Sequence, residues 1–429
     1  MSQRVFIADL PQWFGQEVVL RGWIQRLRET KSTTFILLRD VTGTVQVVAG
    51  PQQTRHLGLK SEDCIEVIGR PRAEARARQG FEVDLVEVSM LSAAGQNLPF
   101  TSSSTLEDVG QETVLDYRPL SLRTERVGTT FRVQAALVEG FREALRRRHF
   151  TEIISSKIVA SGTEGGTNLF AIRYFERTAY LAQSPQFYKE HGVCGLERVF
   201  ETGHVYRAEP HATSRHLTEY YSLDLEMGFI RGPEEVIQLE KEVLSETFET
   251  IRTRFGEALK GFDAYLPSLM EAPTWEFAEC LERLKKAHGR SDLVDDLAPE
   301  AERQLCALAE AETGVSAVFV VGFPLSGRPF YTHPRGEAGA AQSFDLLFRG
   351  VEITTGGQRL HRRADLEAAL TSRGVDPASF EGHLRMFDLG MPPHGGLAIG
   401  AERLTAQVLG LKNVREATLY PRDRHRVEP

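Results

Sequence analysis

The sequence has little cysteine and no long hydrophobic run. No stretch approaches 18 uninterrupted apolar residues, so we expect no membrane-spanning helix and no membrane partner. The first residues, MSQRVFIADLPQ, lack the basic and then apolar layout of a signal peptide, which favours a cytoplasmic protein. Without a CxxC pair there is no sign of a zinc or redox site, and we expect reduced, structural thiols at the four single cysteines, Cys64, Cys194, Cys280 and Cys306.

Two common nucleotide-binding fingerprints are also missing. There is no Walker A sequence, and the glycines at 395, 396 and 400 do not belong to a dinucleotide-binding βαβ unit. The chain has 51 Lys and Arg residues against 59 Asp and Glu residues, a net charge of −8. That balance argues against a surface that coats DNA, although a local basic patch is compatible with it.

What is present points to two domains. Residues 1–95 hold five short strand-like runs separated by turn signals, a pattern typical of an OB-type β-barrel. Residues 96–125 lack apolar periodicity and are expected to form a hinge. Residues 126–429 are then a second domain of the α+β class, with an antiparallel sheet flanked by helices.

Periodicity predicts the main elements of the second domain. Apolar residues recur at helical spacing over 129–150, and they alternate with polar ones over 222–229, as in a strand with one buried face. A strand over 199–207 would pair with it through the loop 208–219. Helical patterns dominate 234–316, which we interpret as an insertion before a further strand at 317–321.

Three polar segments are candidates for chemistry. In RVFETGHVYRAEPHATSRHLTEYYSLDLEM, Arg207 and Glu209 are expected on one strand face, with further cations in the loop at Arg215 and His216. Such cations suit a polyphosphate, although a solvated hairpin would have the same composition. The spacing of its histidines fits no standard zinc pattern.

The second segment, QSFDLLFRGVEITTGGQR, places Asp345 and Glu352 on either side of an Arg-Gly turn. Hard oxygen ligands of this kind suit magnesium that bridges phosphates. The third, MPPHGGLAIGAERLTAQVL, has small residues that would admit a flat ligand, and Arg403 in the first turn of a helix. Each segment alone is also compatible with a purely structural hairpin or strand.

In order along the chain, these segments resemble motifs 2 and 3 of the class II aminoacyl-tRNA synthetases. LAQSPQFYK, YRAEPHATSRHLTEYYSLDLEM, FDLLFRGVEITTGGQRLH and GMPPHGGLAIGAERL look like the aspartyl-tRNA synthetases of the archaeal and eukaryotic type. RGWIQRLR and FILLRDVTGTVQ are similar to that family's anticodon-binding OB domain, and PRDRHRVEP to its C-terminal end. The resemblance covers nearly the whole chain.

The resemblance implies an enzyme that joins L-aspartate to ATP, giving aspartyl-adenylate, and then transfers the aspartyl group to tRNA(Asp). It implies Arg207 and Arg403 as catalytic residues, with adenine held between Tyr220 and Arg403, and Mg²⁺ as cofactor. The ATP-binding set that it implies is Arg207, Glu209, Arg215, His216, Leu217, Tyr220, Glu352 and Arg403. The implied magnesium ligands are Asp345, Glu352 and Thr355.

For the amino acid, the resemblance implies that Lys189 and Arg359 grip the aspartate side chain. A buried carboxylate requires such paired cations, and the related asparaginyl enzymes do not keep the lysine. The full set implied for aspartate is Glu164, Gln186, Lys189, Arg207, Asp224, Thr355 and Arg359.

For tRNA, the resemblance implies that the barrel binds the anticodon. The matching positions are Gln25, Arg28, Phe35, Gln46, Arg78 and Glu82. Phe35 could equally be a core residue, and the arginines of 70–78 could form either a basic strip or a solvated loop. Gln25 and Arg78 look like the type restricted to tRNA(Asp), yet bacterial enzymes of this type often charge tRNA(Asn) too, so both options stay open.

The resemblance also implies a homodimer, although Ser156 stands where the family has an interface proline. An alternative function is a tRNA-independent paralogue that passes aspartyl-adenylate to ammonia, as an asparagine synthetase. Such paralogues tend to lack the N-terminal barrel. A non-catalytic RNA-binding module is a further alternative, and it would be expected to have lost the phosphate-binding arginines and the metal-binding acids.

Overall fold

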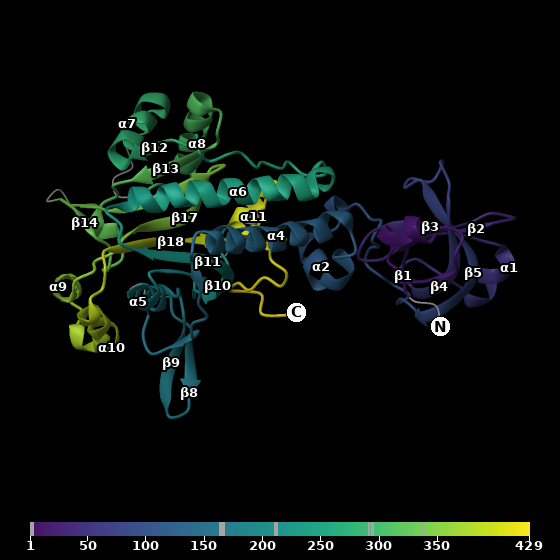
Figure 1. Cartoon of the computed structure of the whole chain (residues 1–429), viewed down its shortest axis with the longest axis horizontal. Coiled ribbons are helices and arrows are strands. Elements are labelled where there is room, and N and C mark those ends of the chain that lie inside the picture. Colours follow the sequence, from purple (N-terminus) through teal and green to yellow (C-terminus); the bar gives the residue numbers. More distant parts are fainter. Residues whose placement is uncertain (1–3, 163–167, 210–212, 291, 293–295, 337–338) are drawn as a thin grey trace. The chain divides into compact units, whose positions relative to one another are not determined.

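The computed structural model describes residues 4–162, 168–209, 213–290, 292, 296–336 and 339–429. The chain forms two compact units, Met1–Gly128 and Thr129–Pro429 (Figure 1). In the described residues, no helix is long and apolar enough to cross a membrane.

The first unit is a closed five-stranded barrel in the order β1-β2-β3-β5-β4. All five strand-like runs of the sequence fall in it, which confirms the predicted OB-type barrel. Side chains alternate along β2, so that Ile36 and Leu38 are fully buried while Phe35 and Leu37 lie on the outer side, half-buried. The strands are β1 (Val18–Glu29), β2 (Thr34–Arg39), β3 (Thr44–Ala49), β4 (Cys64–Ala73) and β5 (Phe81–Ser92).

The remainder of the first unit is short helical turns. The segment 96–125 contains the 3₁₀ helix Leu106–Asp108, α2 (Gln111–Asp116) and α3 (Arg118–Ser121), and belongs to the same compact unit as the barrel. A further turn, α1 (Pro51–Thr54), follows β3, and a 3₁₀ helix, Ile7–Trp13, packs Ile7 and Leu10 into the barrel core.

The second unit is built on an eight-stranded sheet in the order β12-β13-β16-β17-β18-β11-β10-β6. The six central strands pair antiparallel, as predicted, whereas the edge strands β12 and β6 run parallel to their neighbours. Parallel pairing requires a long crossover connection, and both edge strands are joined to their neighbours in that way. The strands are β6 (Thr151–Glu152), β10 (Arg198–Tyr206), β11 (Glu219–Gly228), β12 (Thr274–Glu276), β13 (Ala317–Val321), β16 (Ser343–Phe348), β17 (Val351–Gln358) and β18 (His394–Gly400).

Helices cover the faces of this sheet. The long helices α4 (Glu125–Arg147) and α6 (Pro233–Leu259) lie across it and share a core with Leu223, Leu225 and Met227 of β11 (Figure 1). Helix α5 (Gln186–Leu196) packs against β10 and β11 and contacts Asp224, on the opposite side of β11. The polar face predicted for β11 is therefore buried too, because a helix covers it.

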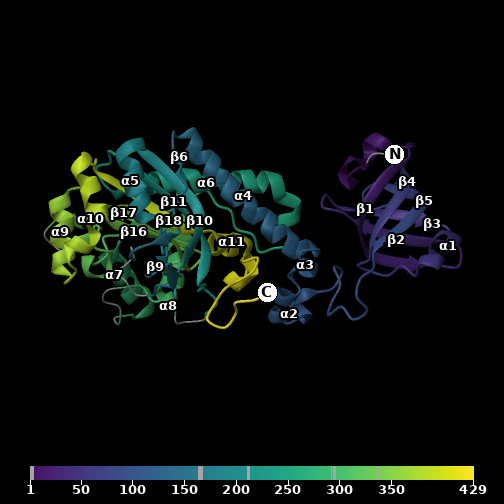
Figure 2. The same cartoon turned by 90° about the horizontal axis from the view of Figure 1, so that it is seen from below.

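Smaller elements surround this core. Helix α6 lies within the predicted insertion 234–316 but is part of the main core, so that prediction is wrong for its first third. The rest of the segment contains α7 (Phe277–His288), α8 (Pro299–Thr313) and strand β12, which pack with β13 on a separate apolar cluster. Helices α9 (Arg363–Ser372) and α10 (Glu381–Leu384) lie together in both views (Figure 1, Figure 2). Helix α11 (Ala401–Leu409) follows β18 directly, and the short strands are β7 (Ile158–Val159), β8 (Ala171–Tyr174), β9 (Arg177–Leu181), β14 (Pro334–Arg335) and β15 (Ala340–Ala341).

Candidate active site

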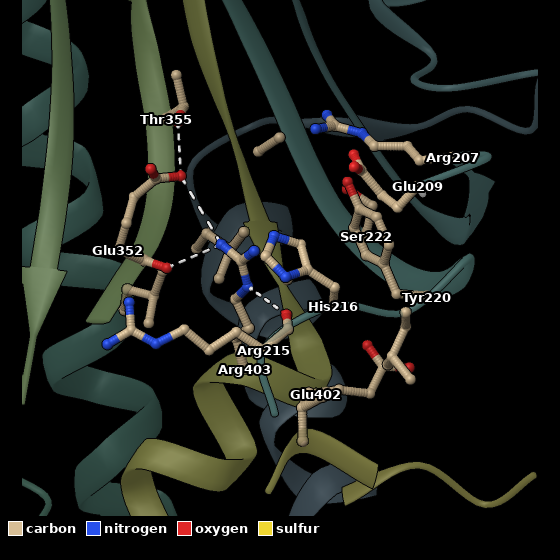
Figure 3. Close-up of a pocket in the computed structure, with 16 residues that line it drawn as sticks. Arg207, Glu209, Arg215, His216, Tyr220, Ser222, Glu352, Thr355, Glu402 and Arg403 are labelled. Carbon is tan, nitrogen blue, oxygen red and sulfur yellow. Dashed lines mark hydrogen bonds and ion pairs between the residues drawn. The ribbon is translucent and has the colours of Figure 1, made fainter. Parts of the chain in front are cut away.

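A cavity of about 270 Å³ opens between the ends of β10, β11, β17 and β18 and the start of α11 (Figure 3). Every residue that the sequence suggested for ATP binding lines this cavity, including the loop residue Leu217 and the helix residue Arg403. Arg207 and Glu209 lie beyond the end of β10 rather than on a strand face as predicted. The strand ends at Tyr206 because the Ala208 N–H donates to the carbonyl of Asn168 instead of pairing with β11.

The guanidinium groups of Arg207, Arg215 and Arg403 line this cavity. Arg215 donates to Glu302 at 2.7 Å and to the Gly350 carbonyl at 3.1 Å. Arg403 donates to the Glu352 carbonyl at 3.1 Å. Arg207 lies with its guanidinium carbon 5.8 Å from the centre of the Tyr220 ring. Cations fixed in this way give a site with the charge that a polyphosphate requires.

Beside the arginines, three side chains with oxygen atoms lie on the hairpin of β16 and β17. Asp345 on β16 pairs in register with Thr355 on β17, and the Thr355 hydroxyl donates to Glu352 at 3.1 Å. Burial, followed by the negative charge of Asp345, raises the pKa of Glu352 to about 7. Carboxylates that repel each other in this way fit a divalent cation. In this structure Arg328, which the sequence analysis missed, binds both oxygens of Asp345 at 2.9 and 2.7 Å.

A second, fully buried group of charges lies on the α5 side of β11. The Lys189 ammonium is 2.9 Å from Asp224 and 3.5 Å from Glu226, and Arg359 donates to Glu226 at 3.0 Å. Burial would lower the pKa of Arg359, but the charge of Glu226 outweighs it and raises that pKa. Glu226 was not among the predicted site residues, although its alternation with apolar residues on β11 places it on the same face as Asp224.

The buried charges border the cavity. Ser222 lines the cavity and donates from its hydroxyl to Asp224 at 2.5 Å. A side chain at Gly396 of β18 would collide with the Leu225 carbonyl and the Glu226 carboxylate, so glycine is needed for this close approach. Of the residues suggested for the amino acid, the structure brings together Gln186, Lys189, Asp224 and Arg359, and Glu164 lies outside the described residues.

In the barrel, the residues suggested for the anticodon come from neighbouring strands. The guanidinium of Arg28 lies 4.7 Å from the centre of the Phe35 ring, and Gln46 donates to Glu82 at 2.9 Å. The core cluster of the barrel does not include Phe35, and Arg78 is exposed. The Gln25 carbonyl accepts a hydrogen bond from Ser103 at 3.0 Å.

The arginines of the segment 70–78 are less available than the sequence suggests. Arg72 pairs with Glu82 and with Asp84, and Arg76 donates to Glu74 at 3.0 Å. The nearby acids therefore compensate part of the positive charge of this segment.

Two family models match the chain. The model described as tRNA synthetases class II (D, K and N) matches residues 110–424, and an OB-fold nucleic acid binding domain model matches residues 18–91. The chain is 46% identical to the aspartate–tRNA(Asp/Asn) ligase of Thermus thermophilus, over 99% of this chain and 100% of the relative. It is 44% identical to the enzyme of the same name from Deinococcus radiodurans, over 100% of this chain and 99% of the relative.

Solved structures show the same architecture. Asparaginyl-tRNA synthetase from Pyrococcus horikoshii, complexed with asparaginyl-adenylate, superposes with a TM-score of 0.92 at 29% identity, and each chain is covered completely. Aspartyl-tRNA synthetase from Entamoeba histolytica superposes with a TM-score of 0.86 at 30% identity, covering 100% of this chain and 93% of that one.

Proposed function

The chain belongs to the class II tRNA synthetases of the D, K and N group, and we propose that it is an aspartate–tRNA ligase. The reaction has two steps. First, the α-carboxylate of L-aspartate attacks the α-phosphate of ATP and expels pyrophosphate. The 3′-hydroxyl of the terminal adenosine of tRNA(Asp) then takes the aspartyl group and releases AMP. The observation that carries this proposal is the pair of buried cations, Lys189 and Arg359, beside a cavity that three arginines line.

For the first step, the cavity supplies charge and position. Arg207 would hold the α-phosphate as negative charge develops on it, and Arg215, His216 and Arg403 would hold the outgoing phosphates. Glu209 would accept a hydrogen bond from the amino group of adenine. The adenine ring would lie between Tyr220 and Arg403. Arg215 and Arg403 are held by hydrogen bonds before the substrate arrives, so little reorganisation of these two groups accompanies the reaction.

Asp345, Glu352 and Thr355 are the residues that would hold Mg²⁺. When bound, the ion neutralises phosphate charge during the displacement. Arg328 donates to both oxygens of Asp345 in this structure, and each of these oxygens keeps a second lone pair with which it could coordinate the ion.

The amino-acid pocket favours an acidic side chain. Lys189 and Arg359 are almost completely buried, and a side-chain carboxylate can form charge-assisted hydrogen bonds with both cations, whereas a neutral amide has no charge to pair with them. Gln186, Asp224 and Thr355 would hold the ammonium and backbone of the substrate. The phosphate-binding arginines and metal-binding acids are all present, and the barrel matches an anticodon-binding model, so a tRNA-independent paralogue or a non-catalytic module is not favoured.

Amino-acid-dependent exchange of pyrophosphate into ATP tests the proposal. We expect exchange with aspartate and not with asparagine. Lys189→Met keeps the length of the side chain but removes its charge, so it should raise the aspartate KM by about 100-fold or more while changing the ATP KM only a few-fold. Lys241→Met, which removes a half-buried lysine of α6, is the control and should leave the aspartate KM unchanged. An unaltered aspartate KM in Lys189→Met would contradict the assignment of the pocket.

We also propose a homodimer. After the edge strand β6, Ile154 is 96% exposed and Ile158 is 45% exposed, which is typical of a surface that a partner covers. Sedimentation equilibrium should give twice the chain mass of 48.0 kDa, and a monomer at micromolar concentration would contradict the proposal. The cytoplasmic location expected from the sequence stays a prediction.

A further inference from the structure

A cluster of ionisable groups lies behind the amino-acid pocket, away from the residues that line the ATP cavity. It consists of Glu190 on α5, His383 on α10 and His394 at the start of β18, with exposed fractions of 0, 5 and 0%. One oxygen of Glu190, Oε2, is 3.6 Å from His383 Nε2 and 3.9 Å from His394 Nε2. Both imidazoles therefore face the same buried carboxylate.

The ring hydrogen bond of His394 and the position of its second nitrogen favour a doubly protonated imidazole. His394 Nδ1 is 2.8 Å from the carbonyl oxygen of Pro392, and a carbonyl can only accept, so Nδ1 must carry a hydrogen. A neutral imidazole has a single N–H, and the bare Nε2 would then turn its lone pair toward the Glu190 carboxylate. A second proton, on His394 Nε2, converts this repulsion into an ion pair.

His383 has no need of an extra proton. Its Nδ1 is 2.9 Å from His191 Nε2, so a neutral His191 can donate to a neutral His383, whose own Nε2–H then faces Glu190. Phe187 stacks on the His383 ring at 4.0 Å between ring centres, which fixes the orientation of that ring. The cluster thus contains one anion, one cation and one neutral imidazole, and it adjoins a second neutral imidazole, that of His191.

The pKa shifts agree with this assignment. Burial would raise the pKa of Glu190, but the hydrogen bonding and charge of the histidines, chiefly His394, outweigh burial and lower it to about 2. Burial would lower the pKa of His394, but its contact with Glu190 outweighs burial and raises it. For His383 burial dominates and lowers the pKa to about 4.

The cluster is joined to the amino-acid pocket at two points. Glu190 Oε1 accepts from the Gln186 amide nitrogen at 2.6 Å, so the Gln186 oxygen is turned toward Arg359, at 3.4 Å. The backbone N–H of Arg359 donates to the His394 carbonyl at 2.9 Å. Glu190 and His394 therefore each hold a residue proposed to bind the substrate.

The proton also sets the charge of the pocket. Lys189 and Arg359 carry two positive charges, against three negative charges on Asp224, Glu226 and Glu190. With His394 protonated the sum is zero, and without that proton it is −1. The other ionisable groups around the cluster are His191 of α5 and His361, which follows β17, and burial lowers the pKa of both.

We propose that Glu190, His383 and His394 form a buried proton-binding centre that positions Gln186 and Arg359 and keeps the pocket neutral, so that aspartate binding is coupled to the proton on His394. The inference rests on the proposed function, because aspartate is the ligand with a net negative charge. Loss of the proton gives the pocket the same sign of charge as the substrate, and the aspartate KM should rise as pH rises through the pKa of His394.

Substitutions that exchange charge for a neutral amide test this coupling at pH 7. In His394→Gln the centre keeps Glu190 but loses the cation, and we expect the aspartate KM to rise about tenfold or more with little change in the ATP KM. Glu190→Gln restores neutrality without a proton, because the new amide can accept from Gln186 and donate to a neutral His394. His383 would then take its other tautomer, with Nδ1–H donating to His191 and a bare Nε2 facing the amide nitrogen. The double substitution Glu190→Gln with His394→Gln is also neutral and should bring the KM back close to that of the unmodified enzyme.

The pH profile separates this role from a merely structural one. Between pH 6 and 9 the aspartate KM of the unmodified enzyme should rise, whereas that of Glu190→Gln should stay flat. These two profiles decide the matter if His394→Gln does not fold. His288→Gln, at an exposed histidine of α7, is the control and should retain the unmodified profile.

The possible failures are distinguishable. A His394→Gln enzyme with an unchanged aspartate KM, a double substitution no better than the single one, or equal pH profiles for the unmodified enzyme and Glu190→Gln would overturn the proton-binding centre. Absence of aspartate-dependent exchange in the unmodified protein would instead contradict the proposed function.

Discussion

At the scale of single residues, two buried glutamates of the second unit have environments that shift their pKa values in opposite directions. Glu190 faces two histidines, whereas Glu240 on α6 accepts one hydrogen bond, from the Thr354 hydroxyl at 2.6 Å. Burial raises the pKa of Glu240 to about 8, and the bond from Thr354 offsets only part of this. Near neutral pH the folded protein therefore keeps Glu240 protonated, as a neutral group in an apolar core.

This difference predicts how stability depends on pH. Because the pKa of Glu240 is higher in the folded chain than in the unfolded chain, the folded state binds more protons between about pH 4.5 and 8, and stability falls as pH rises through that range. Glu240→Gln removes this loss and should stabilise the protein by on the order of a few kcal/mol at pH 9 and much less at pH 5. Thermal unfolding at the two pH values measures it.

Glu282→Gln, at an exposed glutamate of α7, is the matched control and should change the melting temperature little at either pH. An equal change in melting temperature at pH 5 and pH 9 for Glu240→Gln would show that Glu240 does not titrate in the folded state as described.

Recognisable motifs suggested Arg207 and Arg403, which line the cavity, and Lys189, which lies in the buried group of charges beside it. The residues that were missed act through contacts between distant parts of the chain. Arg328 reaches Asp345 across a loop, and His383 reaches Glu190 from a different helix. Nothing in the local pattern around such residues shows which buried partner they will meet.

At the scale of elements, regular periodicity predicted the strands of the barrel and the long helices. The edge strands β6 and β12 are only two and three residues long, too short for a pattern to emerge. The end of β10 was misplaced because the Asn168 carbonyl, far away in sequence, accepts the hydrogen bond that ends the strand. Hydrogen bonds of this kind are set by the tertiary fold.

The β1–β2 pair gives a prediction at this scale. Phe35 lies on the outer side of β2 beneath Arg28, where a base could stack on it, rather than in the core. Phe35→Ala should lower kcat/KM for tRNA charging by about 10- to 100-fold, the usual effect of losing one stacked base, and leave pyrophosphate exchange unchanged. Leu37→Ala removes an apolar side chain from the same side of the same strand and should lower charging much less.

Pyrophosphate exchange also distinguishes tRNA binding from a structural role for Phe35. If Phe35→Ala lowered exchange and charging by the same factor, the residue would contribute to folding rather than to tRNA binding.

At the scale of the whole molecule, the order of the two units could be predicted from the sequence, because each carries its own periodicity and motifs. The family models match the same two regions, residues 18–91 and 110–424. The choice of the second tRNA could not be predicted. Gln25 and Arg78 suggest restriction to tRNA(Asp), whereas the relatives from Thermus thermophilus and Deinococcus radiodurans are named for both tRNA(Asp) and tRNA(Asn).

The most direct test of the central claim is charging of purified tRNA(Asp) and tRNA(Asn) transcripts, assayed separately, with labelled aspartate and with labelled asparagine. We expect aspartyl-tRNA(Asp), and no charging of either transcript with asparagine. Aspartate on tRNA(Asn) as well would place the enzyme with the relatives that act on both tRNAs. Formation of asparaginyl-tRNA, or no charged tRNA from either transcript, would contradict the account.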